Sequence, residues 1–137
     1  MSAVYLVEGK RTPQVKSGAD LKDVAAPYLG HYLIRYLVDK YDVPVDQVDE
    51  VIVGNTGTPA KYPNLGRVIA LEAGLDKKTS GYSVHRNCAS GMEALSQAYD
   101  KITSGRADIV FAGGVENMSQ MPLMYGPQMT EFFIKLM

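Results

Sequence analysis

The chain has 137 residues, enough for one domain with a hydrophobic core, and 46% of them are hydrophobic. The formal net charge is −1, without runs of basic or acidic residues, which argues against a nucleic-acid-binding protein. A single cysteine excludes an internal disulfide and indicates a reducing compartment. We therefore expect a cytoplasmic protein, with no signal peptide at its start and no membrane-spanning segment.

The first half of the chain alternates strand and helix patterns. Residues 3–7 form a short apolar run, which predicts a buried strand. A helix is expected from about Pro27, which suits a first helical turn, to Tyr41. Residues 44–48 predict a brief turn of helix, and the apolar run 50–54 predicts a strand buried on both faces. The inward stripe of the first helix is predicted to be Tyr28, Leu29, Tyr32, Leu33, Tyr36 and Leu37.

Two loops in this half carry residue types that bind anions. Lys10 and Arg11 are adjacent, but paired basic residues in a loop are more often solvated. Residues 54–59 form a glycine- and threonine-rich loop after a strand. Pro59 and Pro63 delay the next helix, so its N-terminus does not reach the place where an anion would need it. We therefore assign neither loop a phosphate site.

The second half continues the alternation. A helix is expected from Asn64 to Gly74, a strand at 81–84, a helix from an Asn87 cap to Gly105, and a strand at 108–112. This order predicts an α/β fold with a mostly parallel sheet and helices on both faces, and sites in such folds lie at the carboxyl ends of the strands. The apolar stripe of the helix that begins at Asn87 is predicted to be Cys88, Met92, Leu95, Tyr99 and Ile102.

Cys88 is the candidate nucleophile. The pattern places it in the first turn of a helix, where the macrodipole and unpaired N–H groups favour a thiolate. The alternative is that Cys88, on an apolar stripe, is a small buried hydrophobic residue. His85 lies three residues away, a spacing that does not secure contact with the thiol, and Glu93 and Glu116 are expected to be structural.

Two blocks of the second half read Asn87-Cys88-Ala89-Ser90-Gly91-Met92-Glu93-Ala94-Leu95 and Ala112-Gly113-Gly114-Val115-Glu116-Asn117-Met118-Ser119. The first resembles the nucleophile segment of the thiolases, and the second resembles the segment just beyond their nucleophile helix. The likeness runs in the family's order from about Val4 to Leu123. Further matches are Arg11-Thr12-Pro13, Leu21-Lys22-Asp23-Val24, Gly54-Asn55 and Asn64-Leu65-Gly66-Arg67.

The resemblance implies a three-layer α/β/α fold, of which this chain carries an incomplete N-terminal half. It implies a domain over residues 1–118 and the start of a truncated loop domain over 119–137. Residues 129–137 look like a helix cut off in mid-course, so we interpret the chain as a fragment or as one piece of a split enzyme.

The resemblance also implies acyl transfer to or from coenzyme A, with cleavage of a 3-ketoacyl-CoA or condensation of acyl-CoA. Cys88 would be the acyl-thioester nucleophile, and its backbone N–H a candidate oxyanion donor. Coenzyme A is expected as a substrate, with no bound cofactor and no metal. Thiolases take a histidine, a second cysteine and an asparagine from their second half, so competence is expected only with a C-terminal part.

Two alternatives stay open. One is a non-catalytic, truncated thiolase-like module that serves only in association. The other is a related ketoacyl-synthase-like condensing enzyme. The expected partners are acyl-CoA and CoA, together with a second copy of the chain, pairing through the strand at 81–84, or a complementary C-terminal thiolase chain.

Overall fold

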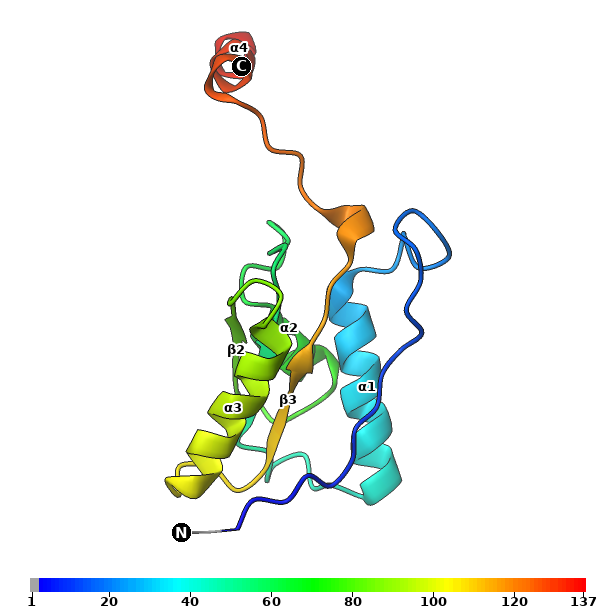
Figure 1. The fold of residues 1–137 in the computed structure, drawn as a ribbon, viewed down its shortest axis with the longest axis vertical. Helices are drawn as coiled ribbons and strands as arrows, with labels where there is room; N and C mark the ends of the chain where they lie inside the picture. The colour runs from blue at the N-terminus through cyan, green and yellow to red at the C-terminus, as the bar shows by residue number, and fades with distance from the viewer. Residues whose placement is uncertain (1–2) are drawn as a thin grey trace.

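The computed structural model describes residues 3–137, and their globular body has three layers in the order α/β/α (Figure 1). The middle layer is a parallel sheet of β1 (Glu50–Gly54), β2 (Ser80–Val84) and β3 (Val110–Gly114), in the order β2-β1-β3. Helices α1 (Ala26–Tyr41) and α2 (Leu65–Glu72) cover one face, and α3 (Ser90–Thr103) covers the other. The predicted α/β fold with a parallel sheet is confirmed.

The central strand β1 is buried on both faces, as its continuous apolar run predicts. Val51 and Val53 belong to the core cluster under α1 and α2, whereas Ile52 belongs to the cluster under α3. Neither Val51 nor Ile52 exposes any surface. Because side chains alternate along a strand, one strand holds the two helical layers together.

The strand expected at residues 108–112 begins and ends two residues later than predicted. The N–H groups of Asp108 and Ile109 donate to the carboxylate of Asp49, and the carbonyl of Ile109 accepts from the N–H of Asp49. These bonds use the backbone groups of residues 108 and 109 in the connection before the strand. The ladder with β1 therefore starts at Val110 and continues to Gly114.

Helix α1 starts near Pro27 as predicted, but its predicted tyrosine stripe is wrong. Its buried residues are Ala26, Pro27, Ile34 and Val38, whereas Tyr28, Tyr32 and Tyr36 are exposed. A Cβ at Gly30 would lie 2.4 Å from Cδ1 of Ile69, so α1 approaches α2 closely. Small and branched side chains fit that narrow interface, and the tyrosines are turned to solvent.

The predicted stripe of α3 is also wrong, because small residues rather than large ones lie against the sheet. Ala94 and Ala98 are the side chains that lie on the sheet, next to Ile52 and Val84. The larger residues of the stripe point away from the sheet, and Met92 is 70% exposed. The helix ends as predicted, because Gly105 follows it with a φ of 70°.

Helix α2 agrees with its sequence signals at both ends. The side chain of Asn64 accepts from the N–H of Arg67 at 3.1 Å, and Gly74 adopts a left-handed φ of 73°. Residues 44–48, expected to form one turn of helix, form a non-helical turn instead. It is closed by a hydrogen bond from the N–H of Gln47 to the carbonyl of Pro44.

Residues 3–7, predicted as a buried strand, form an exposed segment without regular structure, and Leu6 is 83% exposed. The segment lies outside the sheet, and the chain that follows it runs beside α1 (Figure 1). It is held by Glu8, whose carboxylate lies 2.5 Å from Nζ of Lys40 and also accepts from the hydroxyl of Tyr41. Hydrogen bonds from Lys40 and Tyr41 lower the pKa of Glu8 to about 2.

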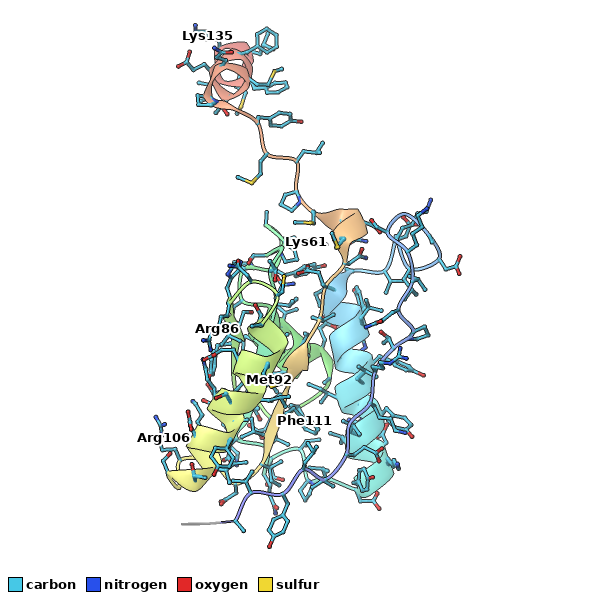
Figure 2. All side chains as sticks on the ribbon, viewed as in Figure 1. Lys61, Arg86, Met92, Arg106, Phe111 and Lys135 are labelled. Atoms are coloured by element: carbon cyan, nitrogen blue, oxygen red, sulfur yellow. The ribbon has the colours of Figure 1, made fainter. Side chains whose placement is uncertain are left out.

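The last part of the chain leaves the body of the molecule. After the short 3₁₀ turn at Met118–Gln120, an irregular segment leads to α4 (Pro127–Leu136), which stands away from the sheet (Figure 1). The helix predicted in this region is confirmed, and Figure 2 shows its Lys135 far from the sheet. All of its residues are exposed, including Phe132 and Phe133.

Candidate active site at the carboxyl edge of the sheet

Three loops meet where the parallel strands end. Gly54 of β1 pairs with Val84 of β2 and with Gly114 of β3, so the strands end at one level. The loops that leave them are residues 55–57, 85–89 and 115–117. The carboxyl edge of a parallel sheet is the usual place for a site, and Cys88 lies in the second of these loops.

Cys88 does not lie in the first turn of a helix, contrary to the prediction. Helix α3 begins at Ser90, its N-cap is Ala89, and no side chain caps it. Asn87 cannot act as the predicted cap because it adopts a left-handed φ of 49°, whereas a capping residue needs an extended backbone. Cys88 is exposed in a tight turn two residues before the helix, which excludes a buried hydrophobic role.

Ser90 holds this turn together. Its hydroxyl accepts from the N–H of Arg86 at 2.8 Å and donates to the carbonyl of Asn87 at 2.7 Å. Its own N–H also donates to the carbonyl of Asn87, at 3.1 Å. Ser90 is buried beneath the turn, so these bonds are shielded from water and Cys88 is presented on the outside.

Glu116 organises the loop after β1. Its carboxylate accepts from Nδ2 of Asn55 at 3.0 Å, from the N–H of Thr56 at 2.9 Å and from the N–H of Gly57 at 3.0 Å. Asn55 is 4% exposed and also donates from Nδ2 to the carbonyl of Val115 at 2.9 Å. These bonds fit the expectation that Glu116 is structural, and Glu116 also lines the cavity described below.

Glycines allow the three segments to approach closely. A Cβ at Gly54 would lie 2.3 Å from the carbonyl carbon of Ser90, and one at Gly114 would lie 3.3 Å from Cα of Gly91. Side chains at these positions would push the start of α3 off the strand ends. The start of α3, which directly follows the Cys88 turn, therefore rests on the backbone of the sheet.

A cavity of about 600 Å3 opens at this edge, and Cys88 is among the residues that line it. The other lining residues come from the strand ends, the first half of α1 and the N-terminal segment, including Arg11 and Lys16. The N-terminal segment is fixed here because Ser119 Oγ accepts from the N–H of Gly18 at 2.9 Å. Sequence reasoning missed Asn55, Thr56 and Ser90 as site residues, although a polar amide directly after a buried strand was a visible signal.

Two residues near Cys88 in sequence lie away from this cavity. His85 is exposed and lines a separate shallow hollow together with Arg86 and Glu93. Glu93 accepts from Gln97 at 3.0 Å and pairs with Arg86 at 2.6 Å, and both contacts lower the pKa of its carboxyl group. Figure 2 shows Arg86 beside the first turn of α3. The structure therefore brings neither His85 nor Glu93 into the cavity with Cys88.

Lys10 and Arg11 both line the cavity but are engaged with their own segment. Lys10 lies 3.4 Å from Glu8, and Arg11 donates to the carbonyl of Thr12. Across residues 3–137, no three histidine, cysteine or acidic side chains are grouped in a way that could hold a metal ion. In the same part of the chain, no helix is both long and apolar enough to cross a membrane.

Comparison with known proteins gives one consistent result. Residues 4–133 match the family model of the thiolase N-terminal domain. A probable acetyl-CoA acyltransferase of Staphylococcus aureus (strain NCTC 8325 / PS 47) is 37% identical over 124 residues, which cover 90% of this chain and 32% of the relative. The chain thus spans about a third of the length of the curated relatives that it matches.

Solved structures agree with the sequence match. The acetyl-CoA acetyltransferase of Bacillus anthracis superposes with a TM-score of 0.78 and 35% identity, over 82% of this chain and 28% of the other. The Acat5 thiolase of Ascaris suum, solved in complex with coenzyme A, superposes with a TM-score of 0.76 and 25% identity, over 81% of this chain and 29% of the other. The chain, with its parallel sheet and its exposed cysteine at the carboxyl edge, belongs to the thiolase family and is a partial N-terminal piece of the thiolase fold.

Proposed function

We propose that this chain carries the nucleophile of a thiolase-type acyl transfer, with Cys88 as the residue that is acylated. One observation carries the proposal: the single thiol of the chain is exposed in a hydrogen-bonded turn that lines a cavity at the carboxyl edge of the sheet. A thiolate is nucleophilic near neutral pH, and the thioester that it forms stays reactive toward a second thiol.

In the cleavage direction, Sγ of Cys88 attacks the 3-keto carbon of a 3-ketoacyl-CoA. The new bond is sulfur to carbon, and the bond that breaks joins C2 to C3. The electron pair left on C2 takes a proton, and acetyl-CoA departs. The thiol of free CoA then displaces the acyl group from Cys88 and regenerates the cysteine. The same steps in reverse condense two acyl-CoA molecules.

The reaction also needs a base for the thiol, an acid for C2 and donors for each oxyanion. The backbone N–H of Cys88 is the proposed donor on this chain. Within the described part of the chain, no histidine lines the cavity that holds Cys88. We therefore propose that acid–base groups reach the cavity from outside the described residues, on a further segment or a complementary chain. Multiple turnover by residues 3–137 alone is not expected.

Acyl-CoA and CoA are the proposed small-molecule partners, with CoA as a substrate. Association is proposed through β2, because β2 is an edge strand among the strands that the structure describes. An edge offers open backbone N–H and C=O groups, which invite a second strand. The partner strand is proposed to come from a second copy of the chain. Residues 119–137 are proposed to begin a separate loop domain, since α4 has no buried residue.

The test is acylation of Cys88 by acetoacetyl-CoA and by acetyl-CoA, followed by intact mass and peptide mapping. We expect one acyl group on Cys88 and loss of labelling in Cys88→Ser. The matched control is the double variant Cys88→Ser with Ser96→Cys, which moves the single thiol to an exposed position on α3 outside the cavity. Acylation of the control as fast as the natural chain would refute a specific nucleophile.

A further inference from the structure

The carbonyl of Asn87, directly before Cys88, accepts three hydrogen bonds. Two come from Ser90, through its hydroxyl at 2.7 Å and its N–H at 3.1 Å, and the third comes from Oγ1 of Thr56 at 3.1 Å. Asn87 has a left-handed backbone, which is uncommon for an L-residue but which asparagine adopts more readily than most. Three donors to its carbonyl hold the residue in place.

The donors differ in what they fix. The bonds of Ser90 run to residues three and four positions away, so they set the shape of the turn. The bond of Thr56 joins residues 31 positions apart and sets where the turn lies relative to the sheet. Among the described residues, Thr56 is thus the side chain that ties the carbonyl before Cys88 to the loop after β1.

Thr56 is itself held by Glu116. The carboxylate of Glu116 accepts from the N–H of Thr56 at 2.9 Å and from that of Gly57 at 3.0 Å, while Asn55 anchors its other oxygen at 3.0 Å. The hydroxyl of Thr56 therefore starts from a fixed backbone. A chain of contacts runs from the end of β3, through Glu116 and Thr56, to the residue before the cysteine.

We propose that Thr56 is a positioning residue, which holds the Cys88 turn in place through the carbonyl of Asn87, and that Glu116 acts through Thr56. The proposal rests on the proposed function, because it assigns the nucleophile to Cys88. Thr56 does not itself react, since its hydroxyl is used on the carbonyl. Its effect is to fix Sγ at one place in the cavity, and a small displacement of a nucleophile costs much of the advantage of orientation.

The test compares Thr56→Val, which removes the donor at similar volume, with Thr56→Ser, which restores it. The matched control is Thr103→Val, because Oγ1 of Thr103 also donates to backbone carbonyls, at 2.9 and 3.2 Å, but lies at the far end of α3. Two quantities are measured on the full chain. The first is amide hydrogen exchange of Ser90, whose N–H donates to Asn87. The second is the rate of Cys88 alkylation by iodoacetamide across pH.

In Thr56→Val we expect exchange at Ser90 to be about fivefold faster, the effect of one lost hydrogen bond. We expect alkylation at pH 7 to slow about threefold, because Sγ is no longer held at one place in the cavity. Thr56→Ser should restore both quantities, and Thr103→Val should change neither. Glu116→Gln should change both in the same direction as Thr56→Val.

Unchanged exchange at Ser90, or an unchanged alkylation profile, in folded Thr56→Val would overturn the proposal. Equal effects of Thr103→Val would also overturn it, because they would show a general loss of stability. These measurements need no acyl-CoA. A failure of Cys88 to accept an acyl group would therefore count against the proposed function alone, and the exchange and alkylation data would still decide the role of Thr56.

Discussion

Replacement of Asn55 by aspartate tests the arrangement beneath the Cys88 turn with a change of almost no volume. Nδ2 of Asn55 donates to the carbonyl of Val115 at 2.9 Å and to the carboxylate of Glu116 at 3.0 Å. In Asn55→Asp, an oxygen replaces that donor and faces two acceptors, one of them charged. The side chain is buried, so water cannot relieve the contact.

The expected loss in the free energy of unfolding follows from these contacts. Each lost hydrogen bond contributes about 1 kcal/mol, and a buried charge without a partner costs about 3–5 kcal/mol. The terms overlap, so we expect the free energy of unfolding at pH 7 to fall by about 3–5 kcal/mol. Burial and Glu116 raise the pKa of the introduced carboxyl above its usual value of about 3.9. The loss is then complete above that raised pKa and becomes smaller as the pH falls through it.

The assay is urea unfolding followed by circular dichroism at pH 7 and at pH 4, each compared with the natural chain. Asn64→Asp is the matched control. Oδ1 of Asn64 accepts from Arg67 N–H, and aspartate caps a helix as well as asparagine does. Nδ2 of Asn64 also donates to the carbonyl of Gly81 at 3.1 Å, but Asn64 is exposed, so water can relieve the lost bond and the change should stay below about 1 kcal/mol. If Asn55→Asp unfolds within about 0.5 kcal/mol of the natural chain at pH 7, the amide does not donate as described.

Three further predictions concern other parts of the molecule. Lys40 and Tyr41 lower the pKa of the Glu8 carboxyl to about 2, so Glu8 holds the N-terminal segment fully above pH 4.5 and loses that hold as the pH falls toward 2. Hydrogen exchange of residues 3–12 should therefore become faster as the pH falls through this range. The variant Glu8→Gln should remove this pH dependence. Gly54→Ala should lower the free energy of unfolding by about 3 kcal/mol, because the new Cβ would lie 2.3 Å from the backbone of Ser90. The control is Gly113→Ala, where nothing lies within 4 Å of the new Cβ. Its free energy of unfolding in the same urea assay should stay within about 0.5 kcal/mol of the natural chain. Light scattering across a wide concentration range should show self-association through β2, and a concentration-independent monomer mass would contradict that expectation.

The features predicted correctly from the sequence are those that depend on a short segment of the chain. The buried run of β1, the Asn64 cap and the left-handed glycines after α2 and α3 depend on neighbours in the chain, and the structure confirms them. Which side of a helix is buried depends on what packs against it. The sequence pattern predicts that the larger side chains of α1 and α3 face inward, but the close approach of neighbouring elements selects small residues such as Ala94 and Ala98.

The site was predictable only in outline. The position of Cys88 just after a strand was visible in the sequence, and so was its place at the carboxyl edge, but the sequence pattern places it in the first turn of α3 rather than before the helix. The position of its turn relative to the sheet could not be derived, because the carbonyl of Asn87 accepts a hydrogen bond from Thr56, which is 31 residues distant. The hydrogen bonds from Asn55 and Thr56 to Glu116 join residues about 60 positions apart, and no local sequence pattern predicts such a pair.

The strand order has a consequence for how the molecule folds. The β1 and β2 ladder closes a shorter loop than the β1 and β3 ladder, and loop closure costs more entropy for longer loops. We therefore expect β1, α2 and β2 to associate first and β3 to join afterwards. Because Glu116 follows β3, the loop that holds Thr56 becomes ordered only in that last step. The Cys88 turn would then be among the final parts to take its native form, and pulse alkylation of Cys88 during refolding would report completion of the whole sheet.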